Sequence, residues 1–244
     1  MYWLRPLVLL LTCHGARMAT KRIIAIRHST TECNEALASA PWGSASFKDP
    51  LLWDTKLSPT GISRALGVHE RLKQKKICDL RNVEVVLSSP LSRALHTADI
   101  LFGGAESEIL PLGVPKVAVP LLRERLYLSS DVGKPRSELE RLFPKWKFDH
   151  LPPDDNPWWY TRPHSVVKKE WRPPGEYPIP GEPEQEFHAR IGELKDFIRQ
   201  RPEESICIVA HWGLLRGLFG INAANCEIFD LTTDSFLDKI PSDC

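Results

Sequence analysis

The sequence lacks closely spaced cysteines, a long hydrophobic run and an excess of either charge. Its six cysteines are too widely separated for a Cys-x-x-Cys or other zinc-ligand spacing, which predicts reduced thiols in a cytosol-like compartment. The apolar stretch at residues 7–11 is far shorter than the roughly 20 residues that a membrane-spanning helix needs. With 32 basic and 31 acidic side chains the net charge is +1, so no global field attracts nucleic acid or an anionic membrane. We therefore expect neither as a partner.

The length and composition are those of one soluble domain. Of the 244 residues, 42% are hydrophobic and 26% are charged, which is ordinary for a globular protein. We expect a single domain over residues 21–244, preceded by an extension at residues 1–20. In that extension Arg5 precedes the apolar stretch and Gly15 and Ala16 follow it, a pattern that also fits a secretory signal at residues 1–16. The alternative is a disordered extension ahead of a start at Met18, which leaves the protein cytoplasmic. A homodimer is left open.

Strand-like and helix-like segments alternate along the chain, which predicts an α/β fold. The candidate strands are short runs rich in Ile and Val at residues 22–26, 84–87, 116–119 and 205–210. Candidate helices begin at Ser58 with Pro59 and at the Ser88-Ser89-Pro90 stretch, and two more span residues 137–143 and 183–198. The apolar face of the first helix would be formed by Ile62, Ala65, Leu66 and Val68. We expect a three-layer α/β/α sandwich with a mostly parallel central sheet.

One segment breaks this alternation. Residues 151–183 contain nine prolines and three tryptophans with little periodicity, which predicts an irregular insertion. Because disordered segments are usually poor in aromatic residues, we interpret it as an ordered cover over the carboxyl edge of the sheet. The alternative is a surface loop without a function.

Two of the predicted strands end on a histidine. The first runs through Arg27 into His28, and the last runs into His211. Because the carboxyl ends of parallel strands lie along one edge, where ligands bind, these histidines can meet although they are far apart in sequence. With an arginine directly before the first of them, they predict a cationic pocket for an anion such as phosphate.

Arg93 and Glu124 complete a set of residues suited to phosphoryl transfer. Two guanidinium groups and two imidazoles would neutralise a phosphoryl group, and a neutral imidazole is a competent nucleophile toward phosphorus. Such a reaction needs mainly in-line placement and charge stabilisation, so this set would suffice without a metal. A carboxylic acid held near an anionic phosphate has a raised proton affinity, which suits Glu124 to protonating the leaving oxygen.

These residues lie in motifs that resemble the histidine phosphatase superfamily, the phosphoglycerate mutase-like proteins. The stretch from Arg27 and His28 to Asn34 resembles the family's Arg-His-Gly signature. His211 and Gly213 resemble the site of its second histidine. Two further blocks resemble family motifs and occur in the family's order. The first is Asp54 with Leu57, Ser58, Gly61 and Ala65. The second is Ser88-Ser89-Pro90-Leu91 with Arg93, Ala94, Thr97 and Ala98. Leu122-Arg123-Glu124 with the stretch from Ser137 to Phe148 is more similar to a plant and fungal subgroup.

The resemblance implies a cofactor-free reaction in which His28 is phosphorylated and then hydrolysed. Arg27, Arg93 and His211 would hold the phosphoryl oxygens, and Glu124 would act first as general acid and then as base. Thr31 and Asn34 would lie in the phosphate loop. Ser89 would cap the helix that positions Arg93.

Two departures from the family pattern bear on activity. Ser29 stands where the family usually has glycine, which predicts a narrower approach to the phosphate. Thr30 and Cys33 replace residues typical of true mutases, and no clear carboxylate-binding group stands in for them. We therefore expect a phosphomonoesterase acting on a small phosphorylated metabolite, with a mutase-type isomerase or a phosphate-binding interaction module as alternatives.

Some of these residues also have ordinary structural interpretations. Glu124 could belong to a surface ion pair, and Glu186 could pair with Arg190 along one helix. Cys33 could be an oxidation-sensitive thiol or simply a small packed residue.

Overall fold

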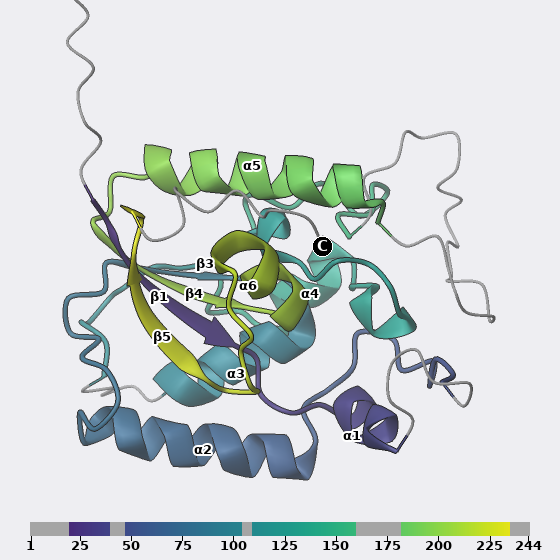
Figure 1. Cartoon of the computed structure of the whole chain (residues 1–244), viewed down its shortest axis with the longest axis horizontal. Coiled ribbons are helices and arrows are strands. Elements are labelled where there is room, and N and C mark those ends of the chain that lie inside the picture. The colour runs from purple at the N-terminus through teal and green to yellow at the C-terminus, as the bar shows by residue number, and fades with distance from the viewer. Residues whose placement is uncertain (1–19, 40–46, 104–108, 160–181, 235–244) are drawn as a thin grey trace, which may run out of the picture.

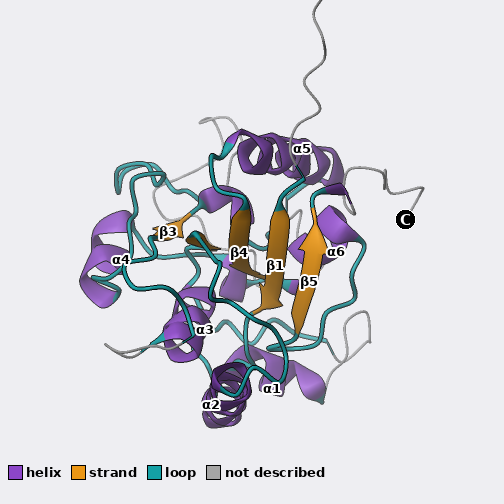
Figure 2. Ribbon diagram, turned by 90° about the vertical axis from the view of Figure 1, so that its left-hand side faces the viewer, coloured by secondary structure: helices purple, strands orange, loops and turns teal. Residues whose placement is uncertain are grey.

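The computed structural model describes residues 20–39, 47–103, 109–159 and 182–234. Within these ranges a five-stranded sheet has the order β3-β2-β4-β1-β5. Four strands are parallel, and β5 is antiparallel to β1 at one edge, with its arrow pointing the opposite way in Figure 2. The strands are β1 (Arg22–Arg27), β2 (Val85–Ser88), β3 (Lys116–Ala118), β4 (Ser205–Ala210) and β5 (Ile228–Thr232).

Helices cover both faces of this sheet, as Figure 1 shows. The α-helices are α1 (Glu32–Ala38), α2 (Pro59–Lys73), α3 (Ser92–Phe102), α4 (Arg136–Leu142), α5 (Glu184–Gln200) and α6 (Trp212–Phe219). Two short 3-10 helices, η1 (Pro120–Leu122) and η2 (Ser129–Asp131), lie between β3 and α4. Figure 1 places α5 on one side of the sheet and α2 and α3 on the other.

The alternation of side chains along the strands builds two cores. Ile24 and Ile26 of β1 pack with buried residues of α2 and α3, whereas Ile23 and Ala25 pack with those of α5 and α6. All four side chains are fully buried, as a central strand of a parallel sheet requires. The expected three-layer α/β/α sandwich with a mostly parallel sheet is therefore confirmed.

The α2 helix begins where the sequence predicts. Ser58 is its N-cap residue, since its hydroxyl accepts a hydrogen bond from the Gly61 backbone, and a proline follows at the first helical position. Ala65 and Val68 of the predicted apolar face are buried. Leu66 was assigned to that face wrongly, because it is 51% exposed and Leu72 takes a buried place on the helix.

The α3 helix begins later than the sequence predicts. Its first residue is Ser92, and the Ser89 hydroxyl accepts a hydrogen bond from the Leu91 backbone in the turn before it. The helix itself is capped by Asp54, whose carboxylate accepts bonds from the Ser92 backbone nitrogen, at 2.8 Å, and from the Ser92 hydroxyl. Arg93 is therefore the second residue of the helix.

Most of the predicted insertion at residues 151–183 lies outside the described residues, as does nearly all of the extension at residues 1–20. Of its tryptophans, Trp158 is buried against Gly133, and its indole nitrogen donates to the Lys134 carbonyl oxygen. Trp159 packs edge-on against Trp158. These two side chains thus pack with the core near α4, and the predicted cover stays a prediction because the rest of the insertion lies outside the described residues. No helix within the described ranges is long and apolar enough to cross a membrane.

Candidate active site

The first candidate residue, His28, directly follows β1 at the carboxyl edge of the sheet. Its backbone nitrogen donates to the Ala210 carbonyl oxygen at 2.8 Å, which holds the end of β1 against the end of β4. Its ring is buried, and Nδ1 lies 2.7 Å from the Ser29 carbonyl oxygen. Because a carbonyl oxygen only accepts, Nδ1 carries the hydrogen and Nε2 keeps its lone pair. Burial and the charges of Arg93 and Arg27 hold the pKa of His28 well below 6.5, so the imidazole is neutral.

The second histidine lies beside the first. His211 follows β4 as the N-cap residue of α6, and its ring centroid is 5.0 Å from that of His28. It is fully buried, and burial together with the charge of Arg93 lowers its pKa well below the usual value. Neither of its ring nitrogens has a hydrogen-bond partner in the described part of the chain. A buried polar atom without a partner is costly, which favours a polar ligand at this point.

Both candidate arginines act electrostatically on these two rings. Arg27 donates from Nη1 to the Ala223 carbonyl oxygen at 2.8 Å, whereas its Nε has no partner within the described residues. Arg93 is buried and donates from Nη1 to the Ser130 carbonyl oxygen and from Nη2 to Asp131 Oδ1, at 2.9 Å. The structure thus brings Arg93 and His211 close to Arg27 and His28, from which they are far apart in the sequence.

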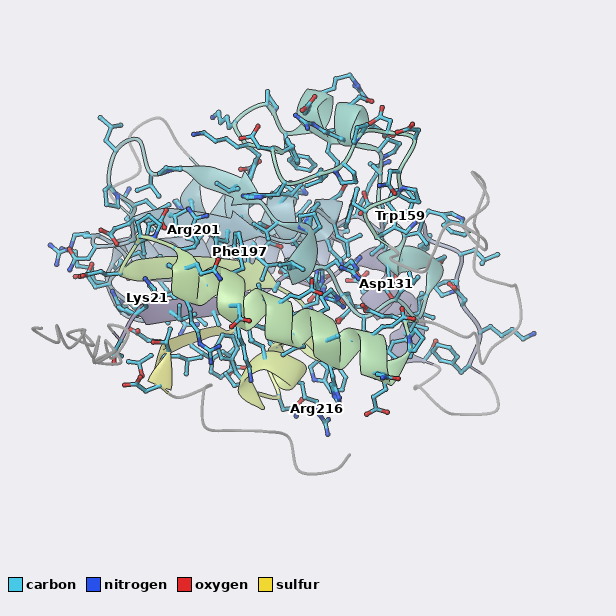
Figure 3. All side chains as sticks on the ribbon, turned by 90° about the horizontal axis from the view of Figure 1, so that it is seen from above. Lys21, Asp131, Trp159, Phe197, Arg201 and Arg216 are labelled. Atoms are coloured by element: carbon cyan, nitrogen blue, oxygen red, sulfur yellow. The ribbon has the colours of Figure 1, made fainter. Side chains whose placement is uncertain are left out.

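Asp131 is a charged neighbour of this group that the sequence analysis missed. Its carboxylate accepts bonds from the backbone nitrogens of Tyr127 and Leu128 as well as from Arg93. Figure 3 shows it at the opposite end of α5 from Lys21 and Arg201, which lie near the amino ends of the strands. It therefore fixes the Arg93 side chain from the carboxyl side of the sheet.

Glu124 is bound to the helix that His211 begins. Its carboxylate accepts hydrogen bonds from the backbone nitrogens of Gly213 at 3.0 Å, Leu214 at 3.1 Å and Arg125 at 2.9 Å. A carboxylate fits the amino end of α6 because unpaired backbone donors point at it there. Burial, followed by the charge of Asp131, nonetheless raises the pKa of Glu124.

Glu124 does not form the surface ion pair that was the alternative interpretation of the sequence. Of its two arginine neighbours, Arg123 pairs with Glu182, and Arg125 donates to the Glu182 carbonyl oxygen. The pair of Glu186 with Arg190 was also predicted wrongly, because Arg190 forms its ion pair with Glu182.

Thr31 and Asn34 form the N-terminal cap of α1. The Thr31 hydroxyl accepts from the Asn34 backbone nitrogen, and Asn34 Oδ1 accepts from the Thr31 backbone nitrogen, so the two make a capping box. Asn225 joins this cap to the histidine, since its amide donates to Asn34 Oδ1 and to the His28 carbonyl oxygen. The cap fixes the course of the loop after His28, and a contact of either residue with phosphate stays a prediction.

Ser29 does not strain the loop. Positive φ values at non-glycine residues of the described ranges occur at Leu51, Asp54, Lys75 and Cys226, and not at Ser29. Its hydroxyl donates to the Gly61 carbonyl oxygen of α2 at 2.7 Å. The side chain thus points into the contact with α2, where it ties the loop to that helix.

Cys33 is a packed residue. It is 3% exposed, and it packs with Phe47 and Leu128 in a small apolar cluster. Burial raises the pKa of its thiol, which disfavours the reactive thiolate. Of the two interpretations made from the sequence, the structure supports packing. No group of three or more His, Cys, Asp or Glu side chains that could hold a metal ion occurs among the described residues.

Comparison with known proteins identifies the family. Residues 23–225 match the family model of the histidine phosphatase superfamily (branch 1). The chain belongs to this superfamily. Among curated proteins it is 27% identical over 196 residues to a phosphoglycerate mutase-like protein of Arabidopsis thaliana, covering 71% of this chain. The chain matches 65% of the length of that relative.

Solved structures share the architecture at low sequence identity. A phosphoglycerate mutase from Bacillus anthracis has a TM-score of 0.48 at 15% identity, with 88% of each chain covered. The ecdysone phosphate phosphatase of Bombix mori has a TM-score of 0.47 at 13% identity, covering 85% of this chain and 87% of that one. Similarities of this size concern the fold alone.

Proposed function

We propose that the protein is a phosphomonoesterase that forms a phosphohistidine at His28 and acts on a small phosphorylated metabolite. The observation that supports this most is the buried pair of neutral imidazoles 5.0 Å apart, one with a free Nε2 and the other with two unpartnered nitrogens. A tetrahedral oxyanion between the rings would satisfy His211 and the Arg27 Nε, because both can donate to it.

The reaction would proceed in two in-line steps. In the first, His28 Nε2 forms a bond to phosphorus while the bond to the leaving oxygen breaks, and that oxygen takes a proton from Glu124. Arg27, Arg93 and His211 would hold the remaining phosphoryl oxygens, where positive charge stabilises the transition state. In the second step water attacks the phosphohistidine, Glu124 takes the proton from that water, and inorganic phosphate leaves. Thr31 and Asn34 would support the loop that receives the phosphate.

Hydrolysis is favoured over mutase chemistry by the state of Arg123, one of the two arginines beside Glu124. A mutase needs groups that bind the carboxylate of its substrate and keep water from the phosphohistidine. Arg123 is 2% exposed and engaged with Glu182, so it is not placed to bind such a carboxylate. The proposed partner is therefore a small phosphorylated molecule.

The proposed compartment is a reducing, cytosol-like one. Cys33, Cys78, Cys207 and Cys226 are all free thiols, and three of them are buried. Scattered buried thiols that form no bridge are typical of proteins that do not pass through an oxidising compartment.

Hydrolysis of an aryl phosphate by the wild-type protein and by His28→Ala tests the function. We expect turnover by the wild type, none by the variant, and no interconversion of 2- and 3-phosphoglycerate. Glu124→Gln should lower kcat/KM for an alkyl phosphate more than for an aryl phosphate, because only the poor leaving group needs the proton in the first step. Interconversion without net hydrolysis would favour the mutase, and no turnover in either assay would favour the interaction module.

A further inference from the structure

A buried carboxylate with two arginine partners lies next to the candidate acid. Glu182 is 2% exposed, and Arg123 and Arg190 are 2% and 4% exposed. Arg190 binds both carboxylate oxygens, from Nε at 2.8 Å and from Nη2 at 2.5 Å, and Arg123 donates to Oε1 at 2.9 Å. Nothing in the proposed reaction uses these three side chains.

The arginines of this cluster hold the backbone that leads to Glu124. Arg190 Nη1 donates to the carbonyl oxygens of Leu121 at 2.9 Å and of Arg123 at 3.0 Å, the residues three and one positions before the acid. Arg123 adds a bond from its own Nη1 to the Pro120 carbonyl oxygen. The carboxylate of Glu182 fixes the guanidinium groups of Arg123 and Arg190. Through them it also fixes the backbone carbonyl groups to which they donate.

The backbone of Glu182 holds the chain on the other side of the acid. Its nitrogen donates to the Leu126 carbonyl oxygen at 2.9 Å, and its carbonyl oxygen accepts from Arg125 Nε at 3.0 Å. The contacts of Glu182, made directly or through Arg190, therefore flank Glu124 in both directions along the chain, at residues 121–123 and at residues 125–126.

The electrostatics make the carboxylate indispensable to this arrangement. Burial and the charge of Arg190 lower the pKa of Arg123 to about 9, so the two guanidinium groups repel each other in a poorly solvated place. Glu182 is the carboxylate bonded to both of them, whereas Glu193 and Glu186 act on Arg123 only through their charge. Without Glu182 the two guanidinium groups would separate, and the carbonyl groups that they bind would lose their anchor.

We propose that Glu182 is a positioning residue for Glu124, acting through Arg123 and Arg190 to hold the acid at the amino end of α6. This rests on the proposed function, since it assigns a purpose to the cluster only if Glu124 donates a proton. The cluster itself touches neither phosphate nor leaving group.

The test compares two substrates in Glu182→Gln. An activated aryl oxide leaves without a proton, whereas an alkoxide needs one, so a displaced Glu124 slows the first step only for the alkyl phosphate. The attack of water on the phosphohistidine, for which Glu124 is the base, is common to both substrates and affects kcat but not kcat/KM. We expect kcat/KM on the alkyl phosphate to fall by about tenfold or more and kcat/KM on the aryl phosphate to change by less than about threefold, the same asymmetry as in Glu124→Gln. A merely structural role would lower both rates together through loss of folded protein.

Glu203→Gln is the matched control. Glu203 also forms a two-pronged pair with an arginine, Arg201, and both side chains are mostly buried. This pair lies beyond the carboxyl end of α5, and Figure 3 places Arg201 at the opposite end of α5 from Asp131. The control should lower stability without any asymmetry between the substrates.

A second variant decides the matter if Glu182→Gln does not fold. Arg190→Lys keeps the positive charge but loses the two-pronged contact, and we expect the same asymmetry at smaller size. An equal loss of kcat/KM on both substrates in the folded variant overturns the proposal, as does an unchanged kcat/KM on the alkyl phosphate. If Glu124→Gln shows the asymmetry and the cluster variants do not, the positioning role fails while the proposed function stands. A wild type that hydrolyses neither substrate instead overturns the function.

Discussion

Replacing Gly213 by alanine should displace the Glu124 carboxylate while leaving the fold intact. A Cβ at this position would lie 2.5 Å from Glu124 Oε1, whereas ordinary van der Waals contact begins at 3.4 Å. The oxygen has to retreat by about 0.9 Å, which strains the bonds of 3.0 and 3.1 Å that the carboxylate accepts from Gly213 and Leu214. Because the clashing atom ends a side chain, it can move without the backbone. A misplacement of about 1 Å costs roughly 100-fold in rate, so we expect about that loss of kcat on an alkyl phosphate.

The assay is steady-state hydrolysis of an alkyl and an aryl phosphate, with thermal unfolding measured in parallel. Gly192→Ala is the matched control, because it lies in α5 with nothing within 4 Å of the added Cβ. Alanine is a better helix former than glycine by up to about 1 kcal/mol, so the control should be slightly more stable and fully active. If Gly213→Ala turns over the alkyl phosphate at the wild-type rate, the position of Glu124 does not matter and it is not the acid.

Two further predictions concern the loop and the histidines. Gly61→Ala should destabilise the protein by about 1–3 kcal/mol, because its Cβ would lie 1.9 Å from a backbone carbonyl oxygen of the loop after His28. Gly67→Ala on the same helix is the control, and it should not destabilise the protein because its Cβ meets nothing within 4 Å. A lower unfolding temperature for both variants, or for neither, contradicts this. The lowered pKa values of His28 and His211 should keep kcat/KM level as pH falls through 6.5, where an ordinary histidine becomes protonated. Both rings bind protons more tightly in the unfolded chain, so the free energy of unfolding should fall below pH 6.5, and a flat profile there would show that the rings are not buried.

The strands that carry the candidate site could be predicted from sequence because their signal is local. A run of Ile and Val that ends on Arg27 and His28, and another that ends on His211, needs no distant contact to be recognised. The rule that ligands bind at the carboxyl ends of parallel strands then brings the two histidines together. The family resemblance supplied Glu124 and Arg93 in the same way, from short motifs.

The residues that the sequence did not reveal act through distant contacts. Asp54 caps α3 from 38 residues away, and Asp131 binds Arg93 across 38 residues. Glu182 resembles an ordinary surface glutamate in the sequence and is among the most buried charges in the described part. The sequence analysis also missed β5. None of its five residues is buried, and its partly buried and exposed residues do not alternate regularly. In each case the role of the residue depends on a contact with a residue far away in the sequence, which a local sequence pattern does not include.

Trapping phosphate on the protein tests the central claim most directly. The wild type, quenched in alkali during turnover of a labelled substrate, should retain a covalent phosphate that is stable in base and lost in acid, and peptide mapping should place it on His28. His28→Ala should retain none. A label on any other residue, or rapid turnover with no label at all under these conditions, would contradict a phosphohistidine at this position.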